Sequence, residues 1–240
     1  MNTEVVSWQE AARVKQAQQQ AQLAASTEGR KYISFKSGVM NVDKTPVPNN
    51  TLPVIALAFA TENSWYAGKY DPTKPQTPAC WSVYTGEEMT PDPECADIQA
   101  DNCKSCDKFK WGSDPQGGRG KACKTRIRIA VLPGDVNSVE EVKAAEIRFA
   151  MLPVTSTKDF ATFMQTCQLK TSRPMFGVVS ELKCTPDAKS QFKVTLTPLR
   201  AVPDDLMLAI LDRVNKAEEE IVYKYQSFEE EAQAPAKPLK

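Results

Sequence analysis

The 240-residue sequence predicts a mainly β fold with flanking helices (α+β), arranged as a small Greek-key barrel that carries an inserted cysteine-rich module. Three observations support this prediction. Apolar or alternating segments of strand length recur through the middle of the chain. One segment of helical periodicity separates them from a final strand pair. Five of the seven cysteines fall between residues 80 and 123.

The chain divides into three predicted parts. Residues 1–27 form an N-terminal helix, because residues 4–25 are rich in Ala and Gln and contain no Gly or Pro, although their apolar face is thin. Residues 28–202 form the barrel, with the cysteine-rich insertion at about 71–125. Residues 203–240 form a C-terminal helix and an acidic, partly disordered tail.

The barrel strands follow from local patterns. Residues 32–35 alternate, residues 39–42 follow a Ser-Gly turn, and residues 52–59 are an apolar run typical of a buried strand. Residues 62–78 are polar and contain several prolines, so we expect a loop there. That loop carries three aromatic side chains, Trp65, Tyr66 and Tyr70, which either stack on a ligand or pack against the cysteine-rich module.

The second half of the barrel has the clearest strand. Residues 125–132 alternate strictly at first and then become apolar. Residues 145–152 predict a further strand or short helix. Thr155 and Ser156 then cap a helix over about 156–168. We expect the rest to be a strand pair over 175–183 and 191–199 and a last helix that starts at Pro203.

The cysteines predict a structural zinc ion. Cys103-Lys-Ser-Cys106 has the spacing of a zinc knuckle, and a tetrahedral site needs a second pair from elsewhere in the chain. Cys123 supplies one more ligand, and either Cys80 or Cys95 supplies the fourth. We favour Cys80, because it closely follows Pro78 at the end of a segment, whereas Cys95 lies in an acidic loop. The remaining two, Cys167 and Cys184, lie in apolar-patterned segments and fit core thiols.

Charge is polarised across the same stretch. Residues 87–101 contain six acidic and no basic side chains, whereas residues 104–128 contain eight basic side chains against two acidic ones. Aromatic residues are interleaved with the basic run. Cations that neutralise phosphates beside rings that stack on unpaired bases are typical of single-stranded nucleic-acid binding. The candidate contacts are Trp65, Tyr66, Tyr70, Lys104, Lys108, Lys110, Trp111, Arg119, Lys121, Arg126 and Arg128.

These features also have a purely structural explanation. The basic side chains would then offset the charge of a four-thiolate zinc centre, and Trp111 would cap the small core of the module.

Composition argues against an enzyme. The chain contains no histidine, which excludes histidine-based triads and histidine-ligated catalytic zinc, and it has neither a P-loop nor a GxGxxG fingerprint. The start of the sequence lacks a signal-peptide pattern, and no apolar run reaches membrane-spanning length. Clustered cysteines with a CxxC pair then favour a reducing cytoplasm.

The charge of the chain is unevenly divided. The net charge is zero, but residues 204–240 hold nine acidic and five basic side chains. Residues 1–203 are therefore mildly basic, and the C-terminal segment is acidic.

The order of strands, one bridging helix and a strand hairpin is the outline of the OB-fold, a barrel that binds single strands across its face. The sequence resembles the single-stranded-DNA-binding proteins of tailed bacteriophages in three stretches: ISFKSGVMNVDKTPVP, ENSWYAGKYDP followed by PACWS, and above all CKSC…WGSDPQGGRGKACKTRIRIAVL. The resemblance covers about residues 28 to 200 and implies an OB-fold with an inserted zinc ribbon, located in the cytoplasm of a bacterial host cell.

The resemblance also implies that the protein coats single-stranded DNA during replication or recombination and recruits replication proteins through its acidic tail. The sequence departs from the family in its all-cysteine ligand set and in a tail that ends in KPLK, although Phe228–Glu231 resembles the family's acidic terminus placed inward. The alternative hypothesis is a zinc-ribbon protein-interaction subunit of a replication or transcription complex.

Overall fold

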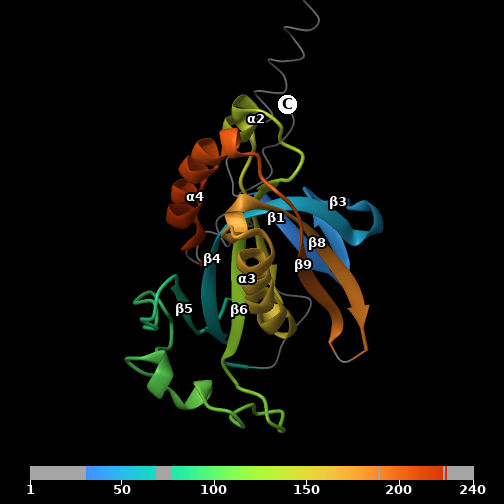
Figure 1. The fold of residues 1–240 in the computed structure, drawn as a ribbon. Helices are drawn as coiled ribbons and strands as arrows, with labels where there is room; N and C mark the ends of the chain where they lie inside the picture. The colour runs from blue at the N-terminus through green and yellow to red at the C-terminus, as the bar shows by residue number, and fades with distance from the viewer. Residues whose placement is uncertain (1–30, 69–76, 189, 224, 226–240) are drawn as a thin grey trace, which may run out of the picture. The chain divides into compact units, whose positions relative to one another are not determined.

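The computed structural model describes residues 31–68, 77–188, 190–223 and 225 (Figure 1). The helix predicted over residues 4–25 and the acidic tail lie outside these residues, as does Tyr70. The described residues form a mixed α+β fold, as the sequence predicts at this level. No helix among them is long and apolar enough to cross a membrane.

One strongly curled sheet organises the fold. Eight strands follow each other across it in the order β3-β2-β1-β7-β6-β4-β8-β9 and form a half-barrel, while β5 pairs with β4 beside this path. All pairings are antiparallel except that of β1 with β7. The strands are β1 (Lys31–Lys36), β2 (Val39–Val42), β3 (Thr45–Pro46), β4 (Thr51–Trp65), β5 (Cys80–Tyr84), β6 (Lys124–Pro133), β7 (Arg148–Leu152), β8 (Val178–Asp187) and β9 (Gln191–Ala201).

Strand β4 is the axis of the sheet, because it pairs with β8 through its first residues, with β6 along most of its length and with β5 at its end. A register shift between Ala56 and Ala58 marks a β-bulge, which increases the local bend. The curl brings distant strands together, since the Cys184 thiol on β8 donates to the carbonyl oxygen of Gly38, in the β1–β2 turn, over 3.4 Å.

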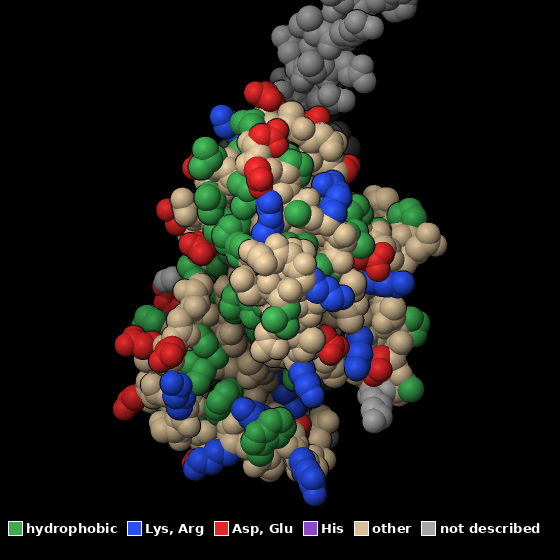
Figure 2. All heavy atoms as spheres, in the orientation of Figure 1, with side chains coloured by type: hydrophobic (Ala, Val, Ile, Leu, Met, Phe, Trp, Pro, Cys, Tyr) green, Lys and Arg blue, Asp and Glu red, His purple; other side chains and the backbone are tan. Residues whose placement is uncertain are grey.

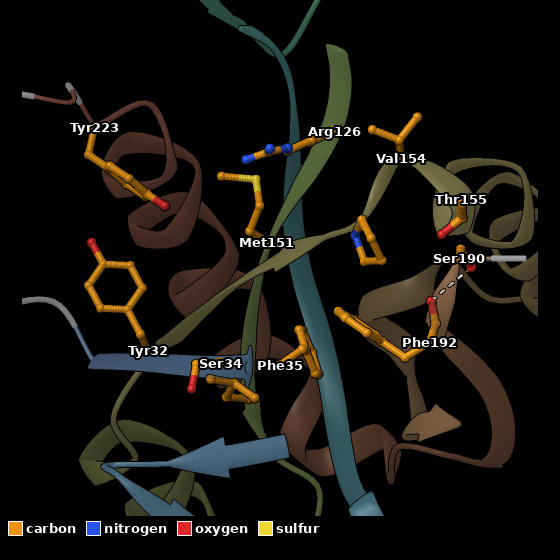
Figure 3. A pocket seen from close by; sticks show the side chains of 12 residues that line it. Tyr32, Ser34, Phe35, Arg126, Met151, Val154, Thr155, Ser190, Phe192 and Tyr223 are labelled. Carbon is orange, nitrogen blue, oxygen red and sulfur yellow. Dashed lines mark hydrogen bonds between the residues drawn. The ribbon is translucent and has the colours of Figure 1, made fainter. Parts of the chain in front are cut away.

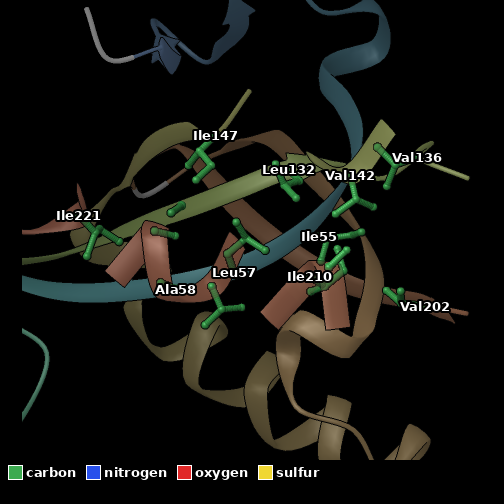
Figure 4. Close-up of a cluster of buried hydrophobic side chains, with 14 of the residues drawn as sticks. Ile55, Leu57, Ala58, Leu132, Val136, Val142, Ile147, Val202, Ile210 and Ile221 are labelled. Carbon is green, nitrogen blue, oxygen red and sulfur yellow. The ribbon is translucent and has the colours of Figure 1, made fainter. Parts of the chain in front are cut away.

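Two cores lie on opposite faces of the sheet. The concave face packs against α3 (Thr157–Thr171), which buries Phe160, Phe163 and Cys167 against Ile127 and Ile129. The convex face packs against α2 (Val139–Ala144) and α4 (Met207–Ile221), as Figure 4 shows. Because successive strand residues point to opposite faces, β6 contributes to both cores.

The strand and helix predictions for 52–59, 125–132, 156–168 and the last helix are confirmed, and the predicted hairpin is β8–β9. Residues 145–152 contain only β7. The predicted loop over 62–78 is wrong at its start, because β4 continues to Trp65. The prediction failed because polar residues usually indicate a loop, whereas Glu62 and Asn63 are buried and bonded to Arg128 and Thr125 on β6.

Candidate nucleic-acid interface

The segment between β4 and β6 contains β5 and two single-turn 3-10 helices, Cys103–Ser105 and Asp107–Phe109. We call residues 78–123 the cysteine module. It has few apolar side chains, and backbone hydrogen bonds hold its loops instead: the Cys103 amide donates to Met89 over 2.7 Å and the Cys123 amide to Lys108 over 2.9 Å. The Asn102 side chain accepts from the Lys104 amide and caps the first 3-10 turn.

The thiols of this module are neighbours. Cys103, Cys106 and Cys123 are buried, and Cys80 is half-buried. Burial raises the pKa of Cys123 to about 12, and the charges of the other three thiols act in the same direction. Burial also raises the pKa of Cys103, which Ser82 and Asn63 partly offset.

Proximity does not amount to a formed metal site. Within the described part of the chain, no group of three or more Cys, Asp or Glu side chains is arranged as a ligand set. The four thiols therefore belong to one module without forming a ligand set.

Cys95 is bound into the backbone instead. Its sulfur accepts from the Trp81 amide over 3.1 Å and donates to the Trp81 carbonyl oxygen over 3.3 Å. Burial raises the pKa of Cys95 to about 12, and Cys80 beside it acts in the same direction. These bonds give Cys95 a structural role of its own.

Two lysines of the cysteine module lie against aromatic rings of the module and of β4. The Lys121 ammonium lies 3.6 Å from the ring centre of Phe109 and 5.0 Å from that of Trp111, and Lys108 lies 5.2 Å from that of Trp65. Trp111 is 78% exposed. Figure 2 shows Lys and Arg side chains gathered over the lower part of the visible face, around the module.

The other predicted cations differ in whether they form an ion pair. Lys110 forms an exposed ion pair with Asp107 over 2.6 Å. Lys104 and Arg119 are exposed, and neither forms an ion pair within the described residues. Tyr66 is only half-exposed.

The structure corrects the prediction for Arg128. Its side chain is completely buried, and its Nε donates to the Glu62 carboxylate over 2.7 Å. Arg128 and Arg126 do point to the same face of β6, as predicted, but the chain after α4 covers Arg128. A phosphate therefore has access to Arg126 and not to Arg128.

Arg126 borders a groove that the sequence did not predict. The groove has a volume of about 630 Å³ and opens between β1, the ends of β6 and β7, and the β8–β9 turn. In Figure 3, Tyr32 and Tyr223 lie on one side, Phe192 and Ser190 lie on the other, and Phe35 lies between them. The full lining is Tyr32, Ile33, Ser34, Phe35, Arg126, Met151, Pro153, Val154, Thr155, Ser190, Phe192 and Tyr223.

These lining residues come from segments that are far apart in the sequence. Tyr32 and Phe35 lie in a predicted strand, and Phe192 lies next to a turn, so no local pattern distinguishes them from core residues. Only the parallel pairing of β1 with β7 and the curl of the sheet bring them together.

Comparison of the chain with known protein families, with characterised proteins and with solved structures gave no match.

Proposed function

We propose that this protein is a non-enzymatic, sequence-tolerant single-stranded-DNA-binding protein. The observation that carries the proposal is the groove, in which aromatic side chains line an apolar hollow and Arg126 stands at the edge. Rings offer stacking surfaces to any base, and a cation at the rim neutralises a phosphate. Such a site holds a strand without selecting its sequence.

The strand order supports an OB-like barrel. β4, β6 and β7 form an antiparallel meander, α3 follows, and β8–β9 is a hairpin whose first strand returns to pair with β4. In OB-folds, the second and third strands and two loops bind the strand. The corresponding parts here are β6, β7, the loop that contains the cysteine module and the β8–β9 turn. The groove lies among three of these four parts.

The cysteine module would extend the binding surface. The Lys121, Phe109 and Trp111 cluster and the Lys108–Trp65 pair each place a cation against a ring. In each pair the ammonium would contact a phosphate and the ring would stack on a base. Lys104, Lys110 and Arg119 add positive charge to the same module.

We further propose that Cys80, Cys103, Cys106 and Cys123 hold one structural zinc ion. The donor chemistry fits, because thiolate sulfur is a preferred zinc ligand and two of the four thiols belong to a Cys-x-x-Cys turn. The Ser82 hydroxyl beside Cys103 is buried without a hydrogen-bond partner among the described residues, and a thiolate would give it an acceptor. Zinc would supply a cross-link that the small apolar content of the module does not.

The biological setting belongs to the same proposal. A protein of this kind would coat single-stranded DNA in the cytoplasm of a bacterial host during phage replication or recombination. The acidic residues after position 225 would contact replication or recombination proteins.

One observation favours a second candidate function. Trp111 and Ile98 expose 78% and 47% of their surface on the cysteine module. Exposed apolar side chains on a rigid module also suit a protein partner. The alternative is therefore a zinc-ribbon interaction subunit of a replication or transcription complex.

Gel-shift titrations with single-stranded and duplex DNA of mixed sequence distinguish the two functions. We expect preferential binding of the single strand and a loss of about fivefold to a hundredfold in Phe192→Ala, which removes one groove ring. Leu169→Ala is the matched control, because Leu169 is 84% exposed on α3 and does not line the groove. Undetectable DNA binding by the unmodified protein would favour the interaction subunit.

A further inference from the structure

An ion pair is buried on the convex face of the sheet. Glu62 on β4 and Arg128 on β6 are both 0% exposed, and the Nε–Oε2 distance is 2.7 Å. Removing both charges from water is costly, and hydrogen bonds to their other polar atoms offset part of that cost. The Arg128 Nη2 has no hydrogen-bond partner among the described residues, whereas the Arg128 Nη1 and both Glu62 oxygens have one. The groups that provide those hydrogen bonds therefore show what this pair holds in place.

Those groups belong to the chain directly after α4. We call its described residues, Val222, Tyr223 and Tyr225, the strap. The Arg128 Nη1 donates to the Tyr223 carbonyl oxygen over 2.6 Å, and the guanidinium carbon lies 3.9 Å from the ring centre of Tyr223. The Tyr225 hydroxyl donates to the Glu62 carboxylate. Each charge of the pair thus binds one tyrosine of the strap.

The strap is also anchored beside the cysteine module. The rings of Tyr225 and Trp81 are in edge contact, with their centres 5.6 Å apart. Burial and then the Glu62 charge raise the pKa of Tyr225, which keeps its hydroxyl protonated as the donor to Glu62.

The strap in turn supports a wall of the groove. The Tyr223 ring meets Tyr32 edge-on at 6.0 Å and Phe149 at 5.8 Å between ring centres. Tyr32 is the second residue of β1, which pairs with β7 over three residues, Lys31–Ile33. The Tyr32 ring therefore packs against aromatic neighbours, and Figure 3 shows Tyr32 and Tyr223 together on one side of the groove.

We propose that Glu62 and Arg128 are positioning residues for the groove: they hold the strap, the strap holds Tyr223, and Tyr223 fixes Tyr32 as a stacking surface. This inference rests on the proposed single-stranded-DNA binding. It assigns the buried arginine a role in DNA binding without contact between Arg128 and DNA.

The test uses the full chain with Tyr225→Phe, Tyr32→Ala and the double variant. Tyr225→Phe removes the bond to Glu62 and keeps the ring against Trp81. We expect it to weaken single-stranded-DNA binding by about threefold to tenfold, less than the loss of a whole stacked ring. The salt dependence should not change, because no phosphate contact is lost. In the Tyr32→Ala background, Tyr225→Phe should have no further effect on affinity.

Tyr84→Phe is the matched control, since it removes another partly buried tyrosine hydroxyl, on β5, that does not line the groove. It should lower thermal stability without weakening DNA binding. Hydrogen exchange in the absence of DNA gives a separate readout: Tyr225→Phe, unlike Tyr84→Phe, should speed amide exchange in residues 31–35.

The outcomes separate two failures. If the unmodified protein binds DNA and Tyr32→Ala weakens it, but Tyr225→Phe leaves affinity unchanged, the strap is only structural and the inference is wrong. Additive effects of Tyr225→Phe and Tyr32→Ala would also overturn it, because the strap would then act without Tyr32. If the unmodified protein binds no DNA, the proposed function fails and the inference fails with it.

Discussion

At the scale of single residues, Arg126 and Arg128 show how the same side chain on the same strand face takes opposite roles. They lie two positions apart on β6, so both point to the convex side of the sheet. Arg126 borders the groove, whereas Arg128 is sealed beneath the chain that follows α4. What covers each residue, rather than its charge, decides whether it can meet a phosphate.

This difference predicts distinct effects of two alanine substitutions. Arg126→Ala should leave thermal stability nearly unchanged. For single-stranded DNA it should make the negative slope of log K against log salt shallower by about 0.7, because one phosphate contact is lost. Arg128→Ala should instead lower the free energy of unfolding by about 3 to 5 kcal/mol, because Glu62 would remain buried without its partner. Denaturant titration and DNA titration of both variants test this. Equal stability of the two variants would contradict the burial of Arg128.

Trp111 leads to a different prediction, because its exposed ring carries no charge. Trp111→Ala should weaken single-stranded-DNA binding by about 1 to 3 kcal/mol and leave the salt slope unchanged, since stacking releases no counterions. Tryptophan fluorescence of the unmodified protein should be quenched when DNA binds. If the salt dependence becomes shallower in Trp111→Ala, the ring acts by placing Lys121 against a phosphate rather than by stacking.

At the scale of elements, the cysteine module depends on backbone hydrogen bonds and thiols rather than on an apolar core. Its 3-10 turns bring Cys103 and Cys106 to one place, and the bond from the Cys123 amide to Lys108 brings the third thiol to them. Cys80 is the first residue of β5. Three chain segments therefore carry the four thiols, and a metal ion bound by them would hold these segments together.

We expect purified protein to contain about one equivalent of zinc. Cys103→Ser should lose the metal and loosen the module, whereas Cys95→Ser should keep it, because a hydroxyl can still bond to the Trp81 backbone. Elemental analysis and thermal unfolding of both variants provide the measurement. Loss of metal from Cys95→Ser with retention in Cys80→Ser would reverse the choice of ligand.

The C-terminal segment gives a further prediction at this scale. Residues 229–231 are three consecutive glutamates, and the chain reaches them four residues after Tyr225. We expect these negative charges to compete with DNA phosphates for the basic side chains. Deleting residues 226–240 should therefore tighten DNA binding, most clearly at low salt.

A full-length variant with Gln at positions 229, 230 and 231 is the matched control, because it keeps the chain length and removes only the charge. It should tighten binding to a similar extent. Unchanged or weaker binding in both proteins would rule out competition between the tail and DNA.

At the scale of the whole molecule, local patterns predicted the elements better than they predicted the site. The apolar run of β4 and the alternation of β6 predicted these strands directly, since burial on a sheet face leaves that pattern in the sequence. The end of β4 was missed because Glu62 and Asn63 are polar, and their partners Arg128 and Thr125 lie on another strand. The groove was missed for the same reason, because Tyr32, Phe192 and Arg126 meet only through the curl of the sheet.

We propose that this chain binds single strands through phosphate contacts and stacked bases. The most direct measurement is the affinity for a single strand and for the corresponding duplex across a series of salt concentrations. We predict preference for the single strand and a linear fall of log K with log salt, with a slope of about −3 for four or five neutralised phosphates. Equal affinity for the duplex, or binding that does not depend on salt, would contradict the account.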